Sequence, residues 1–452
     1  MKTIFIPIFQ SFIARSILDS DAFKILAGKP DIKIIIFAPG YKKDFYNENF
    51  GSSNVIIESV EDKKLKDLSG TIFHKISVGL LPTYYVKYRQ KIKFLDGHYL
   101  SFFINAFITY VFGPFKWAHQ LFRLFDRAFT PTTLFDGFFE KYNPDLIFSP
   151  DIFSPSDAVF LLSAKRHKVR SIGMVRSWDC TTNKNLLRVL PEKIITNNQN
   201  VKNELIKYHD VSDENVKAVG FPQFDPYLTE KPDSKEEFFS RIGADLKKRL
   251  ILLALPGDAL SDIDWQYLDI LDKAIQNGQI PSDIFFLVST HPQSTSDLSK
   301  FDNHPNFIIK QIGTRFGNNH KATEVDREAT KQLINFIYHS EIVITVNASL
   351  VLDAVIFDKP QIMLGFDGYE KRPFLKSVRR YQKEDNMDGF VKTGAARVVE
   401  NPVELISRIN KYLKNPQIDS GNRDKARKEI LLNPDGKSGE RIADKILDFL
   451  IK

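Results

Sequence analysis

The sequence predicts an α/β protein of two Rossmann-like domains that face each other across a cleft, with an aromatic-rich helical insertion in the first domain. Short β-branched runs alternate with segments of helical spacing along most of the 452 residues. This alternation is typical of parallel sheets covered by helices. A Gly- and Pro-containing break at 220–226 separates two rounds of it. We therefore expect domains over residues 1–228 and 229–432, followed by a C-terminal helix at 433–452.

The composition is that of a globular protein, with 43% hydrophobic and 26% charged residues. Cys180 is the only cysteine, which excludes an intrachain disulfide and fits a reducing, cytoplasmic setting. The nine histidines lack metal-ligand spacing, so we expect no metal and no other cofactor. The formal charge of +7 suits anionic partners, but the basic residues are spread along the chain, which argues against nucleic acid.

Each domain is predicted from its own series of strands. The apolar run at the N-terminus is too short for a secretory signal and is interpreted as the first strand. The expected strands of the first domain are 2–7, 32–38, 54–57, 145–149, 170–175, 193–196 and 216–219. Those of the second domain are 250–254, 284–289, 307–310, 342–346 and 361–364. No GxGxxG follows any of them, so a dinucleotide fingerprint is absent.

The segment 81–142 departs from this rhythm because it is long, aromatic and helical in spacing, with Lys and Arg residues distributed through it. It could be interfacial and lie on an anionic membrane surface. We favour helices packed on the first sheet, because most amphipathic helices face a core. A membrane span is disfavoured, since Ser101, Asn105 and Thr109 interrupt an already short apolar stretch.

The turn after strand 342–346 is the first candidate site. Backbone N–H groups around Asn347, Ala348 and Ser349 could bind a pyrophosphate at the carboxyl end of the strand. Asp353, one helical turn further, could accept a ribose hydroxyl. The alternative is ordinary helix capping by Asn347, with Asp353 on the surface.

A histidine at the end of strand 284–289 is the second candidate. His291, stiffened by Pro292, could donate to a phosphate or act as an acid or base. A histidine that is simply hydrogen-bonded in a turn is the alternative.

The third candidate is the polar loop after strand 170–175. Arg176, Asp179 and Lys184 surround Trp178 in the sequence. A carboxylate and cations beside an indole suit an acceptor with an apolar face and a hydroxyl to deprotonate, with Asp179 as the base. Alternatively, Trp178 fills the cleft wall and Asp179 caps the loop.

Several segments together resemble GT-B glycosyltransferases, and are similar to CDP-glycerol glycerophosphotransferases and UDP-N-acetylglucosamine 2-epimerases. They are 340–364, His291 with Pro292, 219–225 and 435–442. The resemblance implies a nucleotide-activated donor in the second domain and a glycan or lipid-linked acceptor in the first, without a metal. It implies that Ser349 and its turn bind the donor phosphates and that Asp353 binds the ribose. His291 would contact the diphosphate or take part in the chemical step.

The resemblance has departures that affect the expected reaction. The glycerophosphotransferases carry a His-Gly-Thr type loop where this chain has Ser177-Trp-Asp-Cys180. We therefore expect sugar transfer from a nucleotide-sugar to a surface-polysaccharide or glycolipid-type acceptor, by a cytoplasmic enzyme that could sit peripherally at the inner membrane face. The alternatives are transfer of a polyol phosphate from a CDP-linked donor, and a noncatalytic membrane-docking scaffold.

Overall fold

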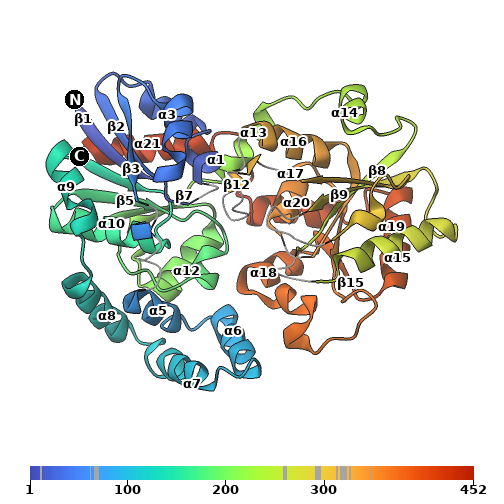
Figure 1. Ribbon diagram of the computed structural model, residues 1–452, viewed down its shortest axis with the longest axis horizontal. Helices are drawn as coiled ribbons and strands as arrows, with labels where there is room; N and C mark the ends of the chain where they lie inside the picture. The colour runs from blue at the N-terminus through green and yellow to red at the C-terminus, as the bar shows by residue number, and fades with distance from the viewer. Residues whose placement is uncertain are drawn as a thin grey trace. The chain divides into compact units, whose positions relative to one another are not determined.

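The computed structural model describes residues 1–10, 13–61, 63–65, 71–257, 262–290, 297–311, 314–315, 323–324, 327–346 and 348–451, without the side chains of the two pairs 314–315 and 323–324. The chain forms two compact units, shown in Figure 1. Unit 1 comprises Met1–Asp225 and Asp435–Lys452, and unit 2 comprises Pro226–Pro434. The C-terminal helix α21 (Ser438–Ile451) thus belongs to unit 1, where Ile442, Ala443 and Ile446 join the hydrophobic core.

Unit 1 is built on a seven-stranded parallel sheet in the order β3-β2-β1-β4-β5-β6-β7. The central strands are buried along their length, because helices cover both faces of a doubly wound sheet. Its strands are β1 (Lys2–Pro7), β2 (Ile32–Pro39), β3 (Val55–Val60), β4 (Leu146–Ser149), β5 (Arg170–Met174), β6 (Lys193–Thr196) and β7 (Val216–Ala218). The strand order reverses between β1 and β4, where such folds bind ligands.

The helices of unit 1 fall into two groups. Those that follow the strands of the sheet are α1 (Ile13–Ile17), α2 (Asp21–Ala27), α3 (Lys43–Phe50), α10 (Pro155–Arg166), α11 (Cys180–Asn183) and α12 (Gln199–His209), with the short η1 (Gly40–Lys42), η3 (Asp213–Asn215) and η4 (Pro222–Phe224). Those inserted between β3 and β4 are α5 (Ile72–Gly79), α6 (Tyr84–Leu95), α7 (Tyr99–Phe107), the π-helical η2 (Ile108–Phe112), α8 (Lys116–Phe129) and α9 (Thr133–Tyr142). Among the described residues, no helix has the length and apolar character needed to cross a bilayer.

Unit 2 repeats the arrangement with a six-stranded parallel sheet in the order β10-β9-β8-β13-β14-β15. Its strands are β8 (Arg249–Ala254), β9 (Ile284–Thr290), β10 (Phe307–Gln311), β13 (Ser340–Thr345), β14 (Gln361–Leu364) and β15 (Ala396–Val399), and a small ribbon pairs β11 (Thr314–Arg315) with β12 (Thr323–Glu324). The order of this sheet reverses between β8 and β13. The predicted α/β class with two Rossmann-like sheets is confirmed.

The helices of unit 2 complete its fold. They are α14 (Lys235–Ile242), α15 (Asp264–Gln276), α16 (Arg327–Tyr338), α17 (Leu350–Ile356), α18 (Asp385–Thr393), α19 (Pro402–Lys414) and α20 (Ser420–Glu429), with η5 (Ser299–Phe301), η6 (Phe374–Lys376) and η7 (Val378–Lys383), while α13 (Asp225–Thr229) spans the boundary between the units. One continuous core holds this unit, from β8 and β9 through α15 to Leu405 and Ile409 of α19.

Candidate functional site

The carboxyl ends of β1, β4 and β5 in unit 1 meet at a cavity of about 360 Å³. This is the point at which the strand order of the sheet reverses. Loops after the three strands and one inserted helix, α5, supply its wall. The lining residues are Gln10, His74, Val78, Asp151, Phe153, Ser154, Pro155, Arg176, Asn183, Lys184 and Asn185.

Two carboxyl groups lie near the end of β4, and they have different partners. Asp151 is 3% exposed and pairs with Arg176, with 3.3 Å between Oδ2 and Nη1. Asp157 is fully buried and accepts a hydrogen bond of 2.9 Å from Ser149 Oγ. Burial, and then the negative charge of Asp151, raise the pKa of Asp157 well above its ordinary value. Burial thus favours the neutral form of Asp157, while Asp151 forms the ion pair with Arg176.

The sequence after β4 explains this placement. Ser154 precedes Pro155 at the first position of α10, and its side chain accepts from the backbone N–H of Asp157. The capped helix start carries Asp157 beneath the sheet end and leaves Asp151 in the loop that lines the cavity.

His74 reaches the cavity from the inserted helix α5. Thr71 caps this helix, and its side chain accepts from the His74 backbone N–H at 3.4 Å. The His74 Nδ1 atom is buried and has no hydrogen-bond partner among the described atoms. Burial, and then the positive charge of Arg188, lower the pKa of this imidazole. His74 is therefore neutral near pH 7, which is the form that accepts a proton.

The residues predicted after β5 divide between cavity and packing roles. Arg176 and Lys184 line the cavity. Asp179 is half-buried at the start of α11, where its backbone oxygen accepts from Asn183, and it is not a lining residue. Trp178 is only 7% exposed and is not among the residues that line the cavity, which leaves the indole little surface on which an acceptor could stack.

The turn predicted to bind a pyrophosphate lies at the carboxyl end of β13, beside β8, where the order of the second sheet reverses. Ser349 is exposed, with φ −57° and ψ −16°, and its side chain makes no capping hydrogen bond. Ala348 is half-buried. Asn347, His291 and Pro292 lie outside the described residues. The described part of the turn thus offers an exposed hydroxyl at the ligand-binding edge of the sheet.

Asp353, to which the sequence gives a ribose-binding role, is buried in the structure. Its side chain is 3% exposed and accepts a hydrogen bond from the Tyr227 hydroxyl, which is equally buried. A carboxylate enclosed in this way has little surface for a ribose. Its position in α17 instead joins that helix to the segment that enters unit 2.

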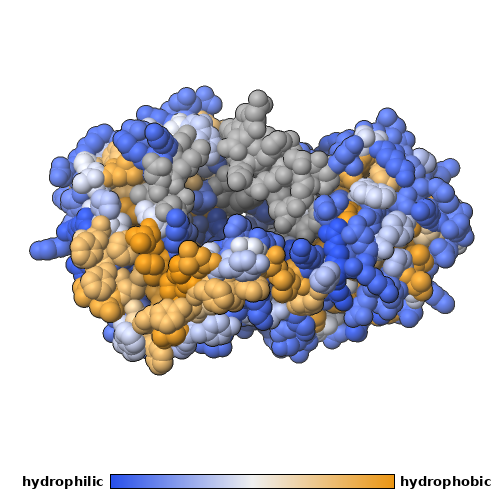
Figure 2. Space-filling model, turned by 60° about the horizontal axis from the view of Figure 1, so that its bottom comes forward, coloured by the Kyte–Doolittle hydropathy of each residue, from blue (hydrophilic) through white to orange (hydrophobic). Residues whose placement is uncertain are grey.

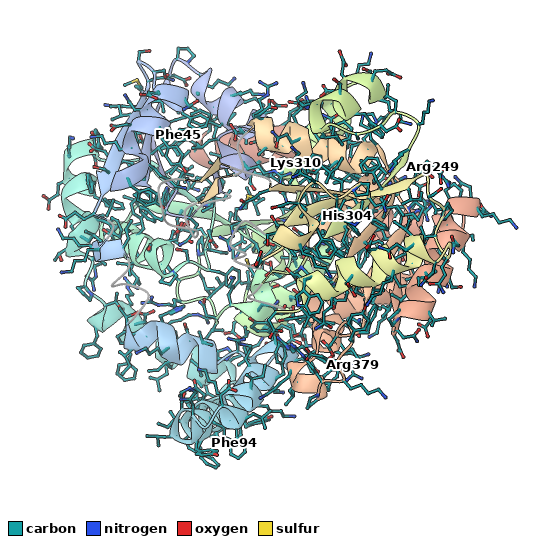
Figure 3. The ribbon with its side chains drawn as sticks, turned by 45° about the vertical axis from the view of Figure 1, so that its right-hand side comes forward. Phe45, Phe94, Arg249, His304, Lys310 and Arg379 are labelled. Carbon is teal, nitrogen blue, oxygen red and sulfur yellow. The ribbon has the colours of Figure 1, made fainter. Side chains whose placement is uncertain are left out.

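The loop after β14 lies at the same edge of the sheet as Ser349, because β13 and β14 are parallel neighbours. Gly368 has φ +60°, and a Cβ there would lie 2.3 Å from Gln266 Oε1, so glycine is required. Arg372 pairs with Asp262 and Glu370. The backbone carbonyl of Arg372 accepts a hydrogen bond of 2.8 Å from the side chain of Arg379. Arg379 is labelled in Figure 3. A hydrogen-bonded loop that contains Arg372 and Arg379 therefore follows the strand next to β13, at the same edge of the sheet.

Sequence reasoning did not identify His74, Asp151 or Asp157. Asp151 could have been found, because it directly follows strand 145–149 in a polar segment, like the loops that were considered. No local signal marks His74, since the insertion that carries it reaches the sheet only in the folded chain.

Comparison with known proteins gives a family match over more than half of the chain. The sequence profile described as CDP-Glycerol:Poly(glycerophosphate) glycerophosphotransferase matches residues 168–448. A search of curated protein sequences gives no match.

Solved structures show the same fold at low identity. UDP-GlcNAc 2-epimerase from Methanocaldococcus jannaschii is 16% identical, with a TM-score of 0.53 over 99% of this chain and 100% of that chain. UDP-GlcNAc 2-epimerase from Neisseria meningitidis, bound to UDP-GlcNAc, is 11% identical, with a TM-score of 0.59 over 99% of this chain and 100% of that chain. The wall teichoic acid polymerase TagF, soaked with CDPG, is 13% identical, with a TM-score of 0.53 over 99% of this chain and 88% of that chain.

Proposed function

The chain belongs to the CDP-glycerol:poly(glycerophosphate) glycerophosphotransferase family, and on this premise we propose that it transfers a polyol phosphate from a CDP-linked donor to a hydroxyl acceptor. The family match carries the proposal, because it spans unit 2 and the part of unit 1 from β5 onward. The coarser statement, that the chain is a transferase with a nucleotide-activated substrate, rests on the same match.

Unit 2 takes the donor in this proposal. Ala348 and Ser349, with Asn347, contact the diphosphate at the end of β13. His291, beside Pro292, stabilises the negative charge that develops on the leaving nucleotide. We expect these groups to suffice without a metal, and turnover that survives EDTA is the check.

Unit 1 takes the acceptor in its 360 Å³ cavity. Arg176 and Lys184 bind polar or anionic groups of the acceptor, and Asp151 holds the guanidinium of Arg176 in place. His74 serves as the base. The acceptor oxygen attacks the phosphorus of the polyol phosphate, its proton moves to the imidazole, and the bond to CMP breaks as the new P–O bond forms.

The variant His74→Gln tests the assignment of the base. Turnover should fall by about 10²–10⁴-fold, the usual contribution of a positioned base, while donor affinity measured by calorimetry stays the same. Asp179→Asn is the matched control, because Asp179 is the alternative base that the sequence suggests. Loss of turnover in Asp179→Asn together with full turnover in His74→Gln would exchange the two roles.

The pH dependence supplies a second readout. Burial and Arg188 lower the pKa of His74 below its ordinary value of 6.5. The base is active when neutral, so the acidic limb of the kcat/KM profile should have its midpoint below pH 6.5. A midpoint above that value would contradict His74 as the base.

Glycosyl transfer is the second candidate. It is favoured by the segment Ser177–Cys180, which replaces the His-Gly-Thr type loop of the glycerophosphotransferases, and by the likeness to a protein bound to UDP-GlcNAc. The released nucleotide separates the two reactions: polyol-phosphate transfer liberates CMP, whereas glycosyl transfer liberates a nucleoside diphosphate. Absence of turnover with every donor would favour the noncatalytic scaffold.

A further inference from the structure

Helices α6, α7 and α8 present an extended apolar surface to solvent. Among the described residues, sixteen of the twenty-eight exposed large hydrophobic side chains lie between Tyr84 and Phe129. Figure 2 shows this concentration as an orange area on the insertion. Scattered exposed apolar residues are ordinary on a protein surface, but a continuous patch of this extent indicates a binding surface.

Helix α7 shows the effect most clearly, because none of its residues is buried. Leu100, Phe103, Ile104 and Phe107 follow the spacing i, i+3, i+4 and i+7, and their exposed fractions range from 52% to 75%. This spacing makes a single apolar stripe, which in a globular protein normally faces the core. Here the stripe faces outward.

Helix α8 carries exposed apolar residues beside its buried side. Its inner side is fixed to unit 1: Asp126 pairs with Arg188, and Arg123 pairs with Asp210 at 2.8 Å. Its outer side carries a second set of exposed apolar residues, namely Leu121, Leu124, Phe125 and Phe129. The inner contacts account for the packing of the helix, so the outer side is available for another partner.

Aromatic rings gather where α6 meets α7. Phe94 lies 5.0 Å from Tyr99 and 5.0 Å from Phe102, measured between ring centroids. Figure 3 labels Phe94 among the side chains at the tip of this helix pair. Trp117, at the start of α8, is 55% exposed. Tryptophan and tyrosine, such as Trp117 and Tyr99, are enriched at membrane–water interfaces.

The charge of the surface identifies its occupant. Between residues 84 and 129 the chain has seven Lys and Arg residues, two Asp and no Glu. One of the two aspartates is the buried Asp126. The exposed cations, which interleave with the apolar residues, are Arg89, Lys91, Lys93, Lys116 and Arg127. Lysine is depleted at the core of protein–protein interfaces, whereas lysine and arginine beside aromatic residues are typical of helices that lie in an anionic lipid surface.

We propose that α6, α7 and α8 form a docking surface for a bilayer that contains anionic phospholipids. The apolar side chains enter the boundary between head groups and acyl chains, and the cations contact the phosphates of the head groups. The proposal does not depend on the identity of the transferred group.

Vesicle flotation of the full chain tests the proposal. The wild-type protein should float with phosphatidylcholine vesicles that contain roughly one third phosphatidylglycerol, and high salt should weaken its binding. The apolar variant Leu100→Ser/Phe103→Ser/Phe107→Ser should remain unbound. The charge variant Lys91→Gln/Lys93→Gln/Lys116→Gln should lose about a hundredfold in affinity, since each cation near the surface contributes about fivefold.

Matched controls lie in unit 2. Leu246, Tyr338 and Val403 are also exposed, and their replacement by Ser should leave flotation unchanged. All of these positions are at the surface, so each variant should retain the circular dichroism and melting temperature of the wild type. CMP release with a water-soluble acceptor should persist in every variant, which separates failure of docking from failure of the proposed reaction.

Two results would overturn the proposal. One is a wild-type protein that stays with the unbound fraction in the presence of anionic vesicles. The other is an apolar variant that floats as well as the wild type. If the wild type does not float and the apolar variant changes a dimer into a monomer in sedimentation, the surface is instead a contact between two copies of the chain.

Discussion

The buried pair of Asp126 and Arg188 attaches the inserted helix α8 to the rest of unit 1, and its loss should lower the stability of that unit. The exposed fractions of the two side chains are 0% and 1%. Arg188 Nε and Nη2 each donate to the carboxylate at 2.7 Å. In the variant Asp126→Asn, the buried guanidinium would keep the neutral amide oxygen and Thr130 Oγ1, at 3.4 Å, as acceptors, but it would lose its compensating negative charge. We expect the free energy of unfolding of unit 1 to fall by about 3–5 kcal/mol, the usual cost of an uncompensated buried charge.

Urea unfolding followed by tryptophan fluorescence measures this loss. Replacing Trp265 by Phe leaves Trp117 and Trp178, both in unit 1, as the reporters. The double variant Asp126→Leu/Arg188→Met should recover most of the stability, because it removes both charges and restores apolar packing. A cost below about 1 kcal/mol for Asp126→Asn, or a double variant as unstable as the single one, would refute the reasoning.

Three further predictions concern contacts that the sequence did not reveal. Asp353→Ala should lower the free energy of unfolding by about 1–3 kcal/mol, because the Tyr227 hydroxyl loses its acceptor, and calorimetry should show unchanged donor affinity; a loss of affinity without a loss of stability would restore the ribose role. Burial lowers the pKa of His209 from 6.5 to about 3, so the unfolded state binds more protons than the folded state between these pH values. The resulting stabilisation, at most about 5 kcal/mol, is complete above pH 6.5 and should disappear as the pH falls toward 3. Urea titrations across this range should show a flatter dependence of stability on pH in His209→Asn. Ile446→Ala should cost about 2–5 kcal/mol, since this side chain is buried in the core of unit 1, whereas Ile451→Ala should cost almost nothing in the same assay.

Most strands could be predicted from the sequence because they are buried on both faces and are therefore continuous β-branched runs, as in β2 and β13. The strand β15 was missed because it lies at the sheet edge and carries Arg397, whose charge is paired with Asp419. The return of α21 into unit 1 could not be predicted either. It depends on contacts such as the backbone N–H of Gly439 donating to Asp225 at 2.7 Å, which join residues far apart in the chain.

The same difference between local sequence patterns and distant contacts explains which residues of the candidate site could be predicted. Arg176 and Lys184 were predicted because a loop after a parallel strand lies at the ligand edge of the sheet whatever the distant packing is. The hydrogen bond that Asp353 accepts from Tyr227 could not be predicted, because Tyr227 lies 126 residues away in the sequence. Helical spacing gives the direction of a side chain relative to its own helix, but it does not identify what packs against that helix.

Helix α5 connects the cavity of unit 1 with the surface proposed to dock on lipid. It supplies His74 and Val78 to the cavity, and it contacts α7 and η2. The Thr109 hydroxyl of η2 donates to the Gly79 carbonyl at 2.6 Å, and Gln90 of α6 donates to the same hydroxyl at 2.6 Å. The position of the proposed base therefore depends on the helices that would touch the bilayer.

Thr109→Val removes the hydroxyl that joins these helices while keeping the shape of the side chain. We expect it to lower turnover with a water-soluble acceptor and to leave vesicle flotation intact, because the outer side of α7 is unchanged; full turnover in this variant would show that α5 holds His74 without help from the insertion.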